Sequence, residues 1–348
     1  MKKYVAVLMA VMMVAALFTG CAPAAPAAAP AETPAAPAAK AVAIAMVTDV
    51  GGVNDQSFNQ SAWEGLQKAQ KDLSIKASYL ESKQEADYAA NLSTLTDQKP
   101  DLIWGIGFMM ANAVADAAKN NPDQKYAIID NSYGDKTPKN VLGVTFKAQE
   151  SSFLVGYIAG KMTKTNKVGF LGGMDFPIIQ NFEYGFKAGV KAANPNCVVL
   201  SQYAGSFADA AKGKSIGEKM YLDGADIIFH AAGATGNGMI EAAKEKGKFA
   251  IGVDKDQNSL APDNVITSAM KRVDNAIYAV SKDMKDGKFA GGTTVSYGLA
   301  EGGVDIAPTS DKHVPKDVLD QVQQLKDKII KGEIKVPATK DEFASFKF

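Results

Sequence analysis

Short apolar runs alternate with longer amphipathic runs from residue 41 onward, and this alternation restricts the possible folds more than any other feature. The short runs are typical of buried strands, and the longer runs have the periodicity of helices that pack on a sheet. Such strand–helix–strand repetition favours parallel sheets that are covered by helices on both faces. The strand-like segments of the first block are AVAIAMVTD, IKASYLES, DLIWGIG and KYAIID.

The same pattern repeats in a second block, with the strand-like segments KVGFLGG, CVVLSQYAG, ADIIFHAAG and FAIGVD. The sequence therefore predicts an α/β protein with two lobes, each a mostly parallel sheet flanked by helices. We place lobe 1 at residues 40–147 and lobe 2 at residues 148–270. Residues 271–348 contain too few elements for a core of their own, so we expect them to return and complete both lobes. Crossings between lobes act as hinges, and ligand sites lie between lobes.

The first residues have the pattern of a secretory signal, which we place at residues 1–20. Two lysines precede an apolar stretch from Tyr4 to Phe18, which is too short for a comfortable membrane span. The segment FTGC is similar to a bacterial lipobox, in which Cys21 would carry the lipid, although Phe18 stands where leucine is usual. An uncleaved or ordinarily cleaved signal is the alternative interpretation.

An alanine- and proline-rich segment follows at residues 21–39. It has almost no charge and no bulky apolar residue, so it cannot bury a core. A lipid anchor, a spacer and a folded body together predict a protein tethered to the cell membrane on its extracytoplasmic side.

Charge and reactive residues exclude several functions. The chain has 38 basic and 38 acidic residues and no basic block, which argues against a nucleic-acid partner. The two histidines, His230 and His313, have no cysteine or second histidine near enough for a metal site. Beyond the alanine- and proline-rich segment the chain has one cysteine, Cys197, which we interpret as a packing residue. No serine nucleophile motif appears, so we expect neither cofactor nor catalysis.

The loop after the first strand-like segment is the most informative candidate site. Asp49 ends that segment, and Ser57 with Gln60 fits a capping box, which places Phe58 and Asn59 in the first helical turn. A phosphate suits a helix start, but no lysine follows and the glycine spacing fits neither phosphate-binding motif. A neutral, flat ligand suits the phenylalanine better. A hydrophobic staple and a turn residue are the ordinary alternatives.

Other strand ends also carry candidate residues. Asp130 and Asp254 each end a strand-like segment, where a carboxylate can accept hydrogen bonds from two neighbouring hydroxyls or from a purine N–H. Aspartate at such a position also commonly caps a turn. The glycine-rich segment 231–238 allows either a close backbone approach to a ligand or an ordinary tight turn. Phe182 and Phe186 lie on one helix face, where core packing is the ordinary expectation.

Five segments of the chain are together specific for one family: TDVGGVNDQSFNQSAWEG, GVTFKAQESSFLVGYIAG, NFEYGFKAGV, AAGATGNG and GVDKDQ. Through most of its length after the spacer the chain resembles the bacterial basic membrane protein lipoproteins, which are nucleoside-binding proteins of ABC importers. The resemblance implies the two-lobed periplasmic-binding-protein fold of the sugar-binding type. It also implies a monomer that captures purine nucleosides between its lobes and delivers them to an ABC transporter permease.

The resemblance also implies roles for single residues. Phe58 and Phe182 would stack on the two faces of the base, whereas Phe186 stays in the core. Asp254 and Lys271 would bind the ribose hydroxyls, and Asp130 would bind the base. Gly233 would let the backbone approach the ligand closely. The candidate ligand-binding residues are Asp49, Phe58, Asn59, Asp130, Phe182, Gly233, Asp254 and Lys271.

Three alternatives remain open at this point. The same fold binds sugars or other small polar solutes, which also favour aromatic rings and carboxylates. The same scaffold hosts enzymes, such as a nucleoside hydrolase. An exposed tether also permits a role as a surface adhesin or sensor component.

Overall fold

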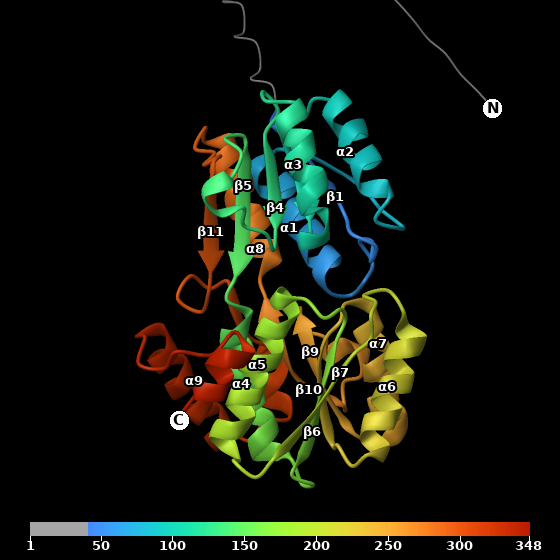
Figure 1. Cartoon of the computed structure of the whole chain (residues 1–348), viewed down its shortest axis with the longest axis vertical. Coiled ribbons are helices and arrows are strands. Elements are labelled where there is room, and N and C mark those ends of the chain that lie inside the picture. The colour runs from blue at the N-terminus through green and yellow to red at the C-terminus, as the bar shows by residue number, and fades with distance from the viewer. Residues whose placement is uncertain (1–40) are drawn as a thin grey trace, which may run out of the picture. The chain divides into compact units, whose positions relative to one another are not determined.

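A computed structural model describes residues 41–348 (Figure 1). The predicted signal at 1–20, the lipidation site Cys21 and the tether at 21–39 lie outside the described residues. Among residues 41–348, no helix combines the length and the apolar character that a membrane span requires.

The first part of this unit builds one α/β lobe, which we call lobe 1. Its strands and helices follow one another in the expected alternation. They are β1 (Ala43–Val47), α1 (Phe58–Leu73), β2 (Lys76–Leu80), α2 (Asp87–Asp97), β3 (Leu102–Ile106), the 3-10 helix η1 (Phe108–Met110), α3 (Ala111–Asn120), β4 (Tyr126–Ile129), the 3-10 helix η2 (Gly134–Lys136) and β5 (Val141–Phe146).

The second part, lobe 2, repeats the same plan. Its elements are α4 (Ala148–Met162), β6 (Lys167–Gly172), α5 (Pro177–Ala193), β7 (Val198–Tyr203), α6 (Ala210–Leu222), β8 (Ile227–Ala231), α7 (Ala234–Lys246), β9 (Phe249–Asp254), the 3-10 helix η3 (Asn258–Leu260) and β10 (Val265–Lys271).

The remaining chain divides between the two lobes. Helix α8 (Val273–Lys285) packs on α1 of lobe 1, and β11 (Thr293–Tyr297) adds a parallel strand beside β5. The α1–α8 contact is close, because a Cβ at Gly65 would lie 2.4 Å from the carbonyl oxygen of Asp274. Strand β12 (Val304–Ile306), the 3-10 helix η4 (Pro308–Lys312), α9 (Lys316–Ile330) and α10 (Lys340–Ser345) return to lobe 2.

Both sheets have the same strand order and therefore the same topological switch point. The order is β2-β1-β3-β4-β5-β11 in lobe 1 and β7-β6-β8-β9-β10-β12 in lobe 2, with only β12 antiparallel to its neighbour. In such doubly wound sheets the ligand crevice opens at the carboxyl ends of the strands where the order reverses. These points lie between β1 and β3 and between β6 and β8.

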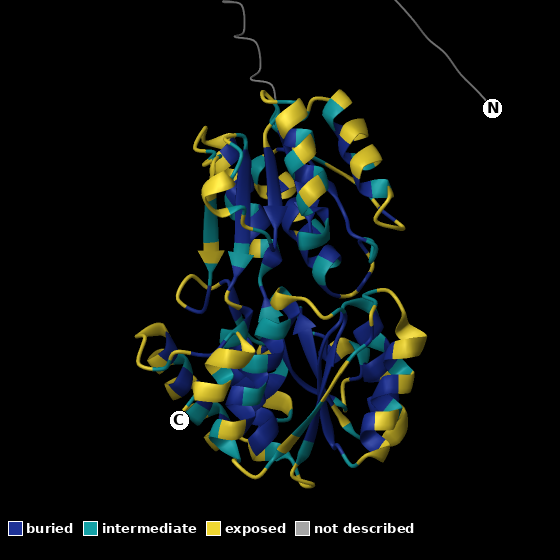
Figure 2. Ribbon diagram, in the orientation of Figure 1, coloured by how far each residue is buried: buried dark blue, intermediate teal, exposed yellow. Residues whose placement is uncertain are grey.

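Burial follows from this layer arrangement (Figure 2). The central strands β3 and β8 are buried along their whole length, because helices cover both faces of each sheet. The edge strands β2 and β7 are partly exposed. Phe186 is fully buried, as expected of a core residue.

The chain passes between the lobes three times, near Lys147, near Arg272 and between β11 and β12. These crossings are tied to one another by backbone hydrogen bonds. The Lys147 N–H donates to the Tyr297 carbonyl at 2.8 Å, and the Arg272 N–H donates to the Gly303 carbonyl at 2.8 Å. Segments that cross between lobes in this way are the usual hinge positions of two-lobed binding proteins.

Candidate functional site

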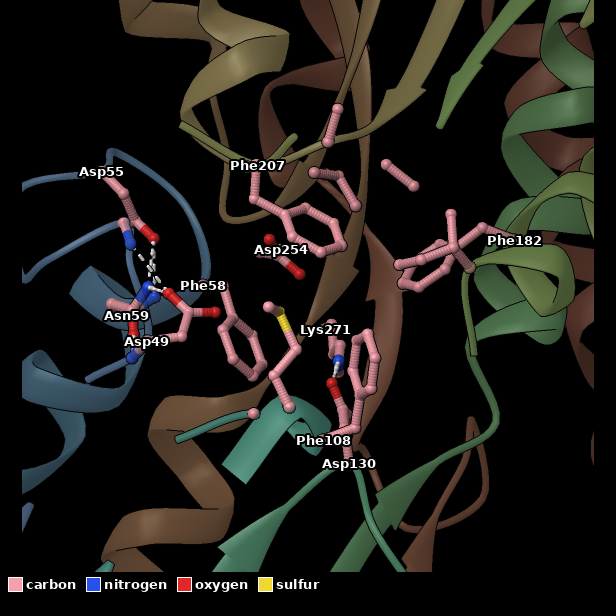
Figure 3. A pocket seen from close by; sticks show the side chains of 18 residues that line it. Asp49, Asp55, Phe58, Asn59, Phe108, Asp130, Phe182, Phe207, Asp254 and Lys271 are labelled. Carbon is pink, nitrogen blue, oxygen red and sulfur yellow. Dashed lines mark hydrogen bonds and ion pairs between the residues drawn. The ribbon is translucent and has the colours of Figure 1, made fainter. Parts of the chain in front are cut away.

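A pocket lies between the lobes at the carboxyl ends of both sheets (Figure 3). Its space is about 570 Å³, including the part that is open to solvent. All eight residues that the sequence nominated line it, from both lobes. Their contact with a ligand stays a prediction.

The start of helix α1 differs from the predicted capping box. Ser57 stands at the N-cap, but its side chain makes no capping hydrogen bond. Instead, the Asp55 carboxylate accepts hydrogen bonds from the backbone N–H groups of Ser57, Asn59 and Gln60 at 2.9, 2.8 and 3.0 Å. The Gln60 side chain accepts from the Gln56 N–H at 3.2 Å rather than from Ser57. The capping-box prediction is therefore wrong, because an aspartate two residues earlier already satisfies these donors.

The Asn59 side chain joins two carboxylates rather than standing free in the pocket. Its amide nitrogen donates to Asp49 at 2.6 Å and to Asp55 at 2.9 Å, and its oxygen accepts from the Asp49 N–H at 3.2 Å. Burial raises the pKa of the Asp49 carboxyl to about 6, although hydrogen bonds from Gly51 and Asn59 oppose this shift. Asn59 therefore orients Asp49, which lies two residues after the end of β1.

Two polar contacts join the lobes inside the pocket. The Ser57 hydroxyl donates to the Asp254 carboxylate, and the Lys271 ammonium group forms an ion pair with Asp130. Burial raises the pKa of Asp254 to about 6, and the charge of Lys271 limits the rise. One oxygen of Asp130 is buried without a hydrogen-bond partner. Lys271, which the resemblance assigns to the ribose, therefore pairs with Asp130, which it assigns to the base.

The two aspartates at these strand ends have an uncommon backbone conformation. Asp130 has φ of 66° and Asp254 has φ of 63°, in the left-handed region that aspartate tolerates better than most residues. This backbone turns each carboxylate out of its sheet and toward the opposite lobe. Strained residues of this kind cluster at ligand sites.

Aromatic rings of both lobes face the pocket. Phe58 comes from the first turn of α1 and Phe182 from α5 of lobe 2, where it is 3% exposed. The Lys271 Nζ atom lies 4.6 Å from the ring centroid of Phe58 and 5.8 Å from that of Phe182. A ring centroid within about 6 Å of an ammonium group gives a cation–π contact. Lys271 therefore contacts both predicted walls.

Two further aromatic rings line the pocket that were not among the predicted residues. Phe108 follows β3 in lobe 1, and Phe207 lies in the loop after β7 in lobe 2. Their centroids are 6.4 Å apart, and Phe108 also lies 5.1 Å from Phe176 of lobe 2. The switch-point rule points to Phe108, because it directly follows the end of β3. Phe207 has no such local signal.

The reactive residues outside the pocket have structural surroundings. His230 is fully buried in β8 and forms a 2.9 Å hydrogen bond with Gln257, and burial lowers its pKa to about 4. Cys197 is partly buried, and burial raises its thiol pKa to about 11. Within residues 41–348, no group of three or more histidine, cysteine or acidic side chains is arranged for a metal ion.

Two doubly wound lobes with a shared pocket and hinge define a class, the bilobed solute-binding proteins. The sequence model of the family described as Bmp, the PnrA-like substrate-binding proteins of ABC transporters, matches residues 42–340. The chain belongs to this family. The predicted family is confirmed, and it is a family of transporter substrate-binding proteins rather than of enzymes.

Named relatives agree with this assignment. The chain is 44% identical to basic membrane protein A of Borreliella burgdorferi over 307 residues, which is 87% of this chain and 90% of that protein. It is 42% identical to the ABC transporter nucleoside-binding protein BmpA of Lactococcus lactis over 315 residues, which is 84% of this chain and 88% of that protein.

Solved structures confirm the predicted fold. An ABC transporter solute-binding protein from Aeropyrum pernix superposes with a TM-score of 0.79 at 30% identity, covering 87% of this chain and 96% of that one. A sugar-binding protein of a sugar ABC transporter from Bacillus halodurans superposes with a TM-score of 0.59 at 15% identity, covering 76% and 96%. The second likeness concerns the fold alone.

Proposed function

We propose that this protein binds purine nucleosides in the pocket between its lobes. One observation carries the proposal: Phe58 of lobe 1 and Phe182 of lobe 2 line the same pocket from opposite sides. A planar base has two faces and gains from a ring on each. The relative from Lactococcus lactis that is named a nucleoside-binding protein supports the same ligand class.

The charges of the pocket favour a neutral ligand with hydroxyl groups. Four carboxylates line it, those of Asp49, Asp55, Asp130 and Asp254, against one cation, Lys271. A phosphate could bind the backbone N–H groups at the start of a helix, but at the start of α1 three of these groups already donate to Asp55. A ribose diol can donate to a carboxylate, whereas a phosphate group would face repulsion from several carboxylates.

A sugar is the second candidate, because carboxylates and an aromatic ring also suit a sugar. The ring count favours the nucleoside, because Phe58 and Phe182 provide a platform for each face of a base.

Titration calorimetry with inosine, guanosine, adenosine, cytidine and ribose tests the proposal. We expect heat and saturation with the purine nucleosides and none with ribose at the same concentrations. Binding of ribose without binding of any nucleoside would support the sugar interpretation. Incubation with inosine, followed by chromatography for hypoxanthine, tests the enzymatic alternative, and we expect no free base.

We further propose that the protein is held at the extracytoplasmic face of the cell membrane by a lipid on Cys21, with residues 21–39 as a spacer. Its monomeric, ligand-bound form would deliver the nucleoside to an ABC permease. The lipobox-like segment FTGC and the transporter family support this proposal. We expect radioactive palmitate to label the wild-type chain in growing cells but not the Cys21→Ser variant. Equal labelling would reject the anchor and leave nucleoside binding untouched.

A further inference from the structure

Two amide side chains of lobe 2 donate hydrogen bonds to two successive carbonyl groups of lobe 1. Asn237 Nδ2 donates to the Asp55 carbonyl at 3.0 Å, and Gln257 Nε2 donates to the Gln56 carbonyl at 3.1 Å. The two amides also contact each other, with Gln257 Nε2 3.4 Å from Asn237 Oδ1. Neither Asn237 nor Gln257 lines the pocket. These bonds therefore join the lobes without involving the ligand.

The loop of lobe 1 is shaped to present these carbonyls. Gln56 has φ of 57°, an uncommon conformation for a residue with a Cβ. The Asp55 carboxylate holds the following turn through three backbone N–H groups, so the loop is fixed to the start of α1. The two carbonyl groups are therefore held as a fixed part of lobe 1.

The Gln257 side chain is equally fixed on the other lobe. It is 2% exposed, and its Oε1 accepts from the Val253 N–H at 2.9 Å and from His230 Nε2 at 2.9 Å. Because Oε1 can only accept, His230 must carry its proton on Nε2. Helix α7 packs closely against this histidine, because a Cβ at Gly236 would lie only 1.8 Å from the His230 Nδ1 atom. Gln257 therefore presents its amide hydrogens to lobe 1 with little freedom.

The other interlobe contacts differ in kind. The Ser57–Asp254 and Lys271–Asp130 contacts lie in the pocket, where a ligand would compete for them. The Lys255–Glu64 ion pair lies outside the pocket at 2.5 Å, but the Glu64 side chain is 44% exposed, and solvent-exposed pairs contribute little.

We propose that Asn237 and Gln257 form an interlobe latch that sets the population of the closed form whether or not ligand is bound. The inference rests on ligand binding between the lobes, as proposed above. A latch changes the equilibrium between open and closed forms but not the contacts of the ligand. The apparent affinity for every ligand then changes by the same factor, while selectivity is unchanged.

Asn237→Ala tests the latch, because Asn237 is partly exposed on a helix and alanine favours helix. One lost hydrogen bond predicts a loss of affinity of about 2- to 10-fold, equal for inosine and guanosine. Asn237→Asp is a near-isosteric second variant that puts a charged acceptor against the Asp55 carbonyl. It should therefore lose more affinity than Asn237→Ala. The ligand-free form of both variants should have a larger radius of gyration in solution scattering than the wild type.

Asn91→Ala is the matched control. Asn91 Nδ2 donates to the Glu81 carbonyl at 3.2 Å within lobe 1. Loss of this hydrogen bond should lower stability without changing affinity or scattering. Unchanged affinity and unchanged scattering in both Asn237 variants, with the fold intact, would overturn the latch. If wild-type protein binds no nucleoside, the proposed function fails, but the scattering of the ligand-free variants still decides the latch.

Discussion

The hydroxyl of Ser57 in lobe 1 donates to the carboxylate of Asp254 in lobe 2, although 197 positions separate the two residues in the chain. This contact gives the buried carboxylate of Asp254 a hydrogen-bond donor from the opposite lobe. A ligand hydroxyl that binds Asp254 would therefore share this carboxylate with a serine of the other lobe, or displace that serine.

Asp254→Ala should discriminate between a nucleoside and its free base. If Asp254 binds the ribose, the variant leaves a buried sugar hydroxyl without an acceptor, at a cost of about 1–3 kcal/mol. Calorimetry should show that loss for inosine and a much smaller one for hypoxanthine. Equal losses for both ligands would remove Asp254 from the ribose role.

Phe58→Ala should weaken nucleoside binding by about 1–3 kcal/mol, the usual contribution of one ring stacked on a base. The free energy of unfolding should fall by less than the binding free energy, because the ring lines a pocket and does not lie in the core. Phe186→Ala is the control, since that fully buried ring should cost about 3–5 kcal/mol of stability with little effect on affinity. A Phe58 variant that unfolds readily but keeps full affinity would show that the ring is a packing residue.

Nucleoside should shift the protein toward the closed form. A ligand that contacts Phe58 and Asp49 of lobe 1 together with Phe182 and Asp254 of lobe 2 binds the closed form better than the open one. A shift from 1:99 to 99:1 requires about 5.5 kcal/mol of differential affinity. We expect a smaller radius of gyration in solution scattering when inosine is added. Saturable binding to an open form whose scattering does not change would contradict closure.

Asp55→Ala should destabilise the fold more than the loss of an ordinary helix cap. The Asp55 carboxylate satisfies three backbone N–H groups at the start of α1, whereas Asp209 accepts from one, that of Lys212, at the start of α6. An ordinary cap contributes about 1 kcal/mol. In urea unfolding, the free energy of unfolding should therefore fall by about that value in Asp209→Ala and by clearly more in Asp55→Ala. Similar losses would mean that water replaces Asp55 without much cost.

Stability of the ligand-free protein should respond to pH through its buried carboxyls. Burial raises the pKa of Asp49 and Asp254 from 3.8 to about 6, so the folded form keeps protons that the unfolded chain has lost. The contribution of these two groups to stability therefore falls as pH rises from about 4 to about 6 and is constant above that range.

Urea unfolding of the wild type and of Asp254→Asn between pH 4.5 and 7.5 measures this effect. The amide cannot ionise, so the free energy of unfolding of the variant, relative to wild type, should increase as pH rises toward 6. The comparison cancels the titrating groups that do not interact with Asp254. A difference that does not vary with pH would mean that Asp254 ionises normally in the folded protein.

The sequence alone determined the α/β class, the two lobes and the edge at which polar residues gather. Alternation of apolar and amphipathic runs is a local property, and parallel strands necessarily end at one edge of their sheet. Asp49, Asp130 and Asp254 could therefore be nominated from their positions after strand-like segments. The assignment of Phe182 and Lys271 required the family resemblance, because neither has a local signal that separates it from core or surface residues.

Only the tertiary structure decided which polar groups pair with one another. Ser57 donates to Asp254 of the opposite lobe instead of capping α1, a pairing that no local pattern indicates. Phe207 reaches the pocket because lobe 2 places its loop opposite Phe108. These pairs join segments that are distant in the chain, and their partners depend on how the two lobes meet. A pattern with a period of a few residues carries no information about that arrangement.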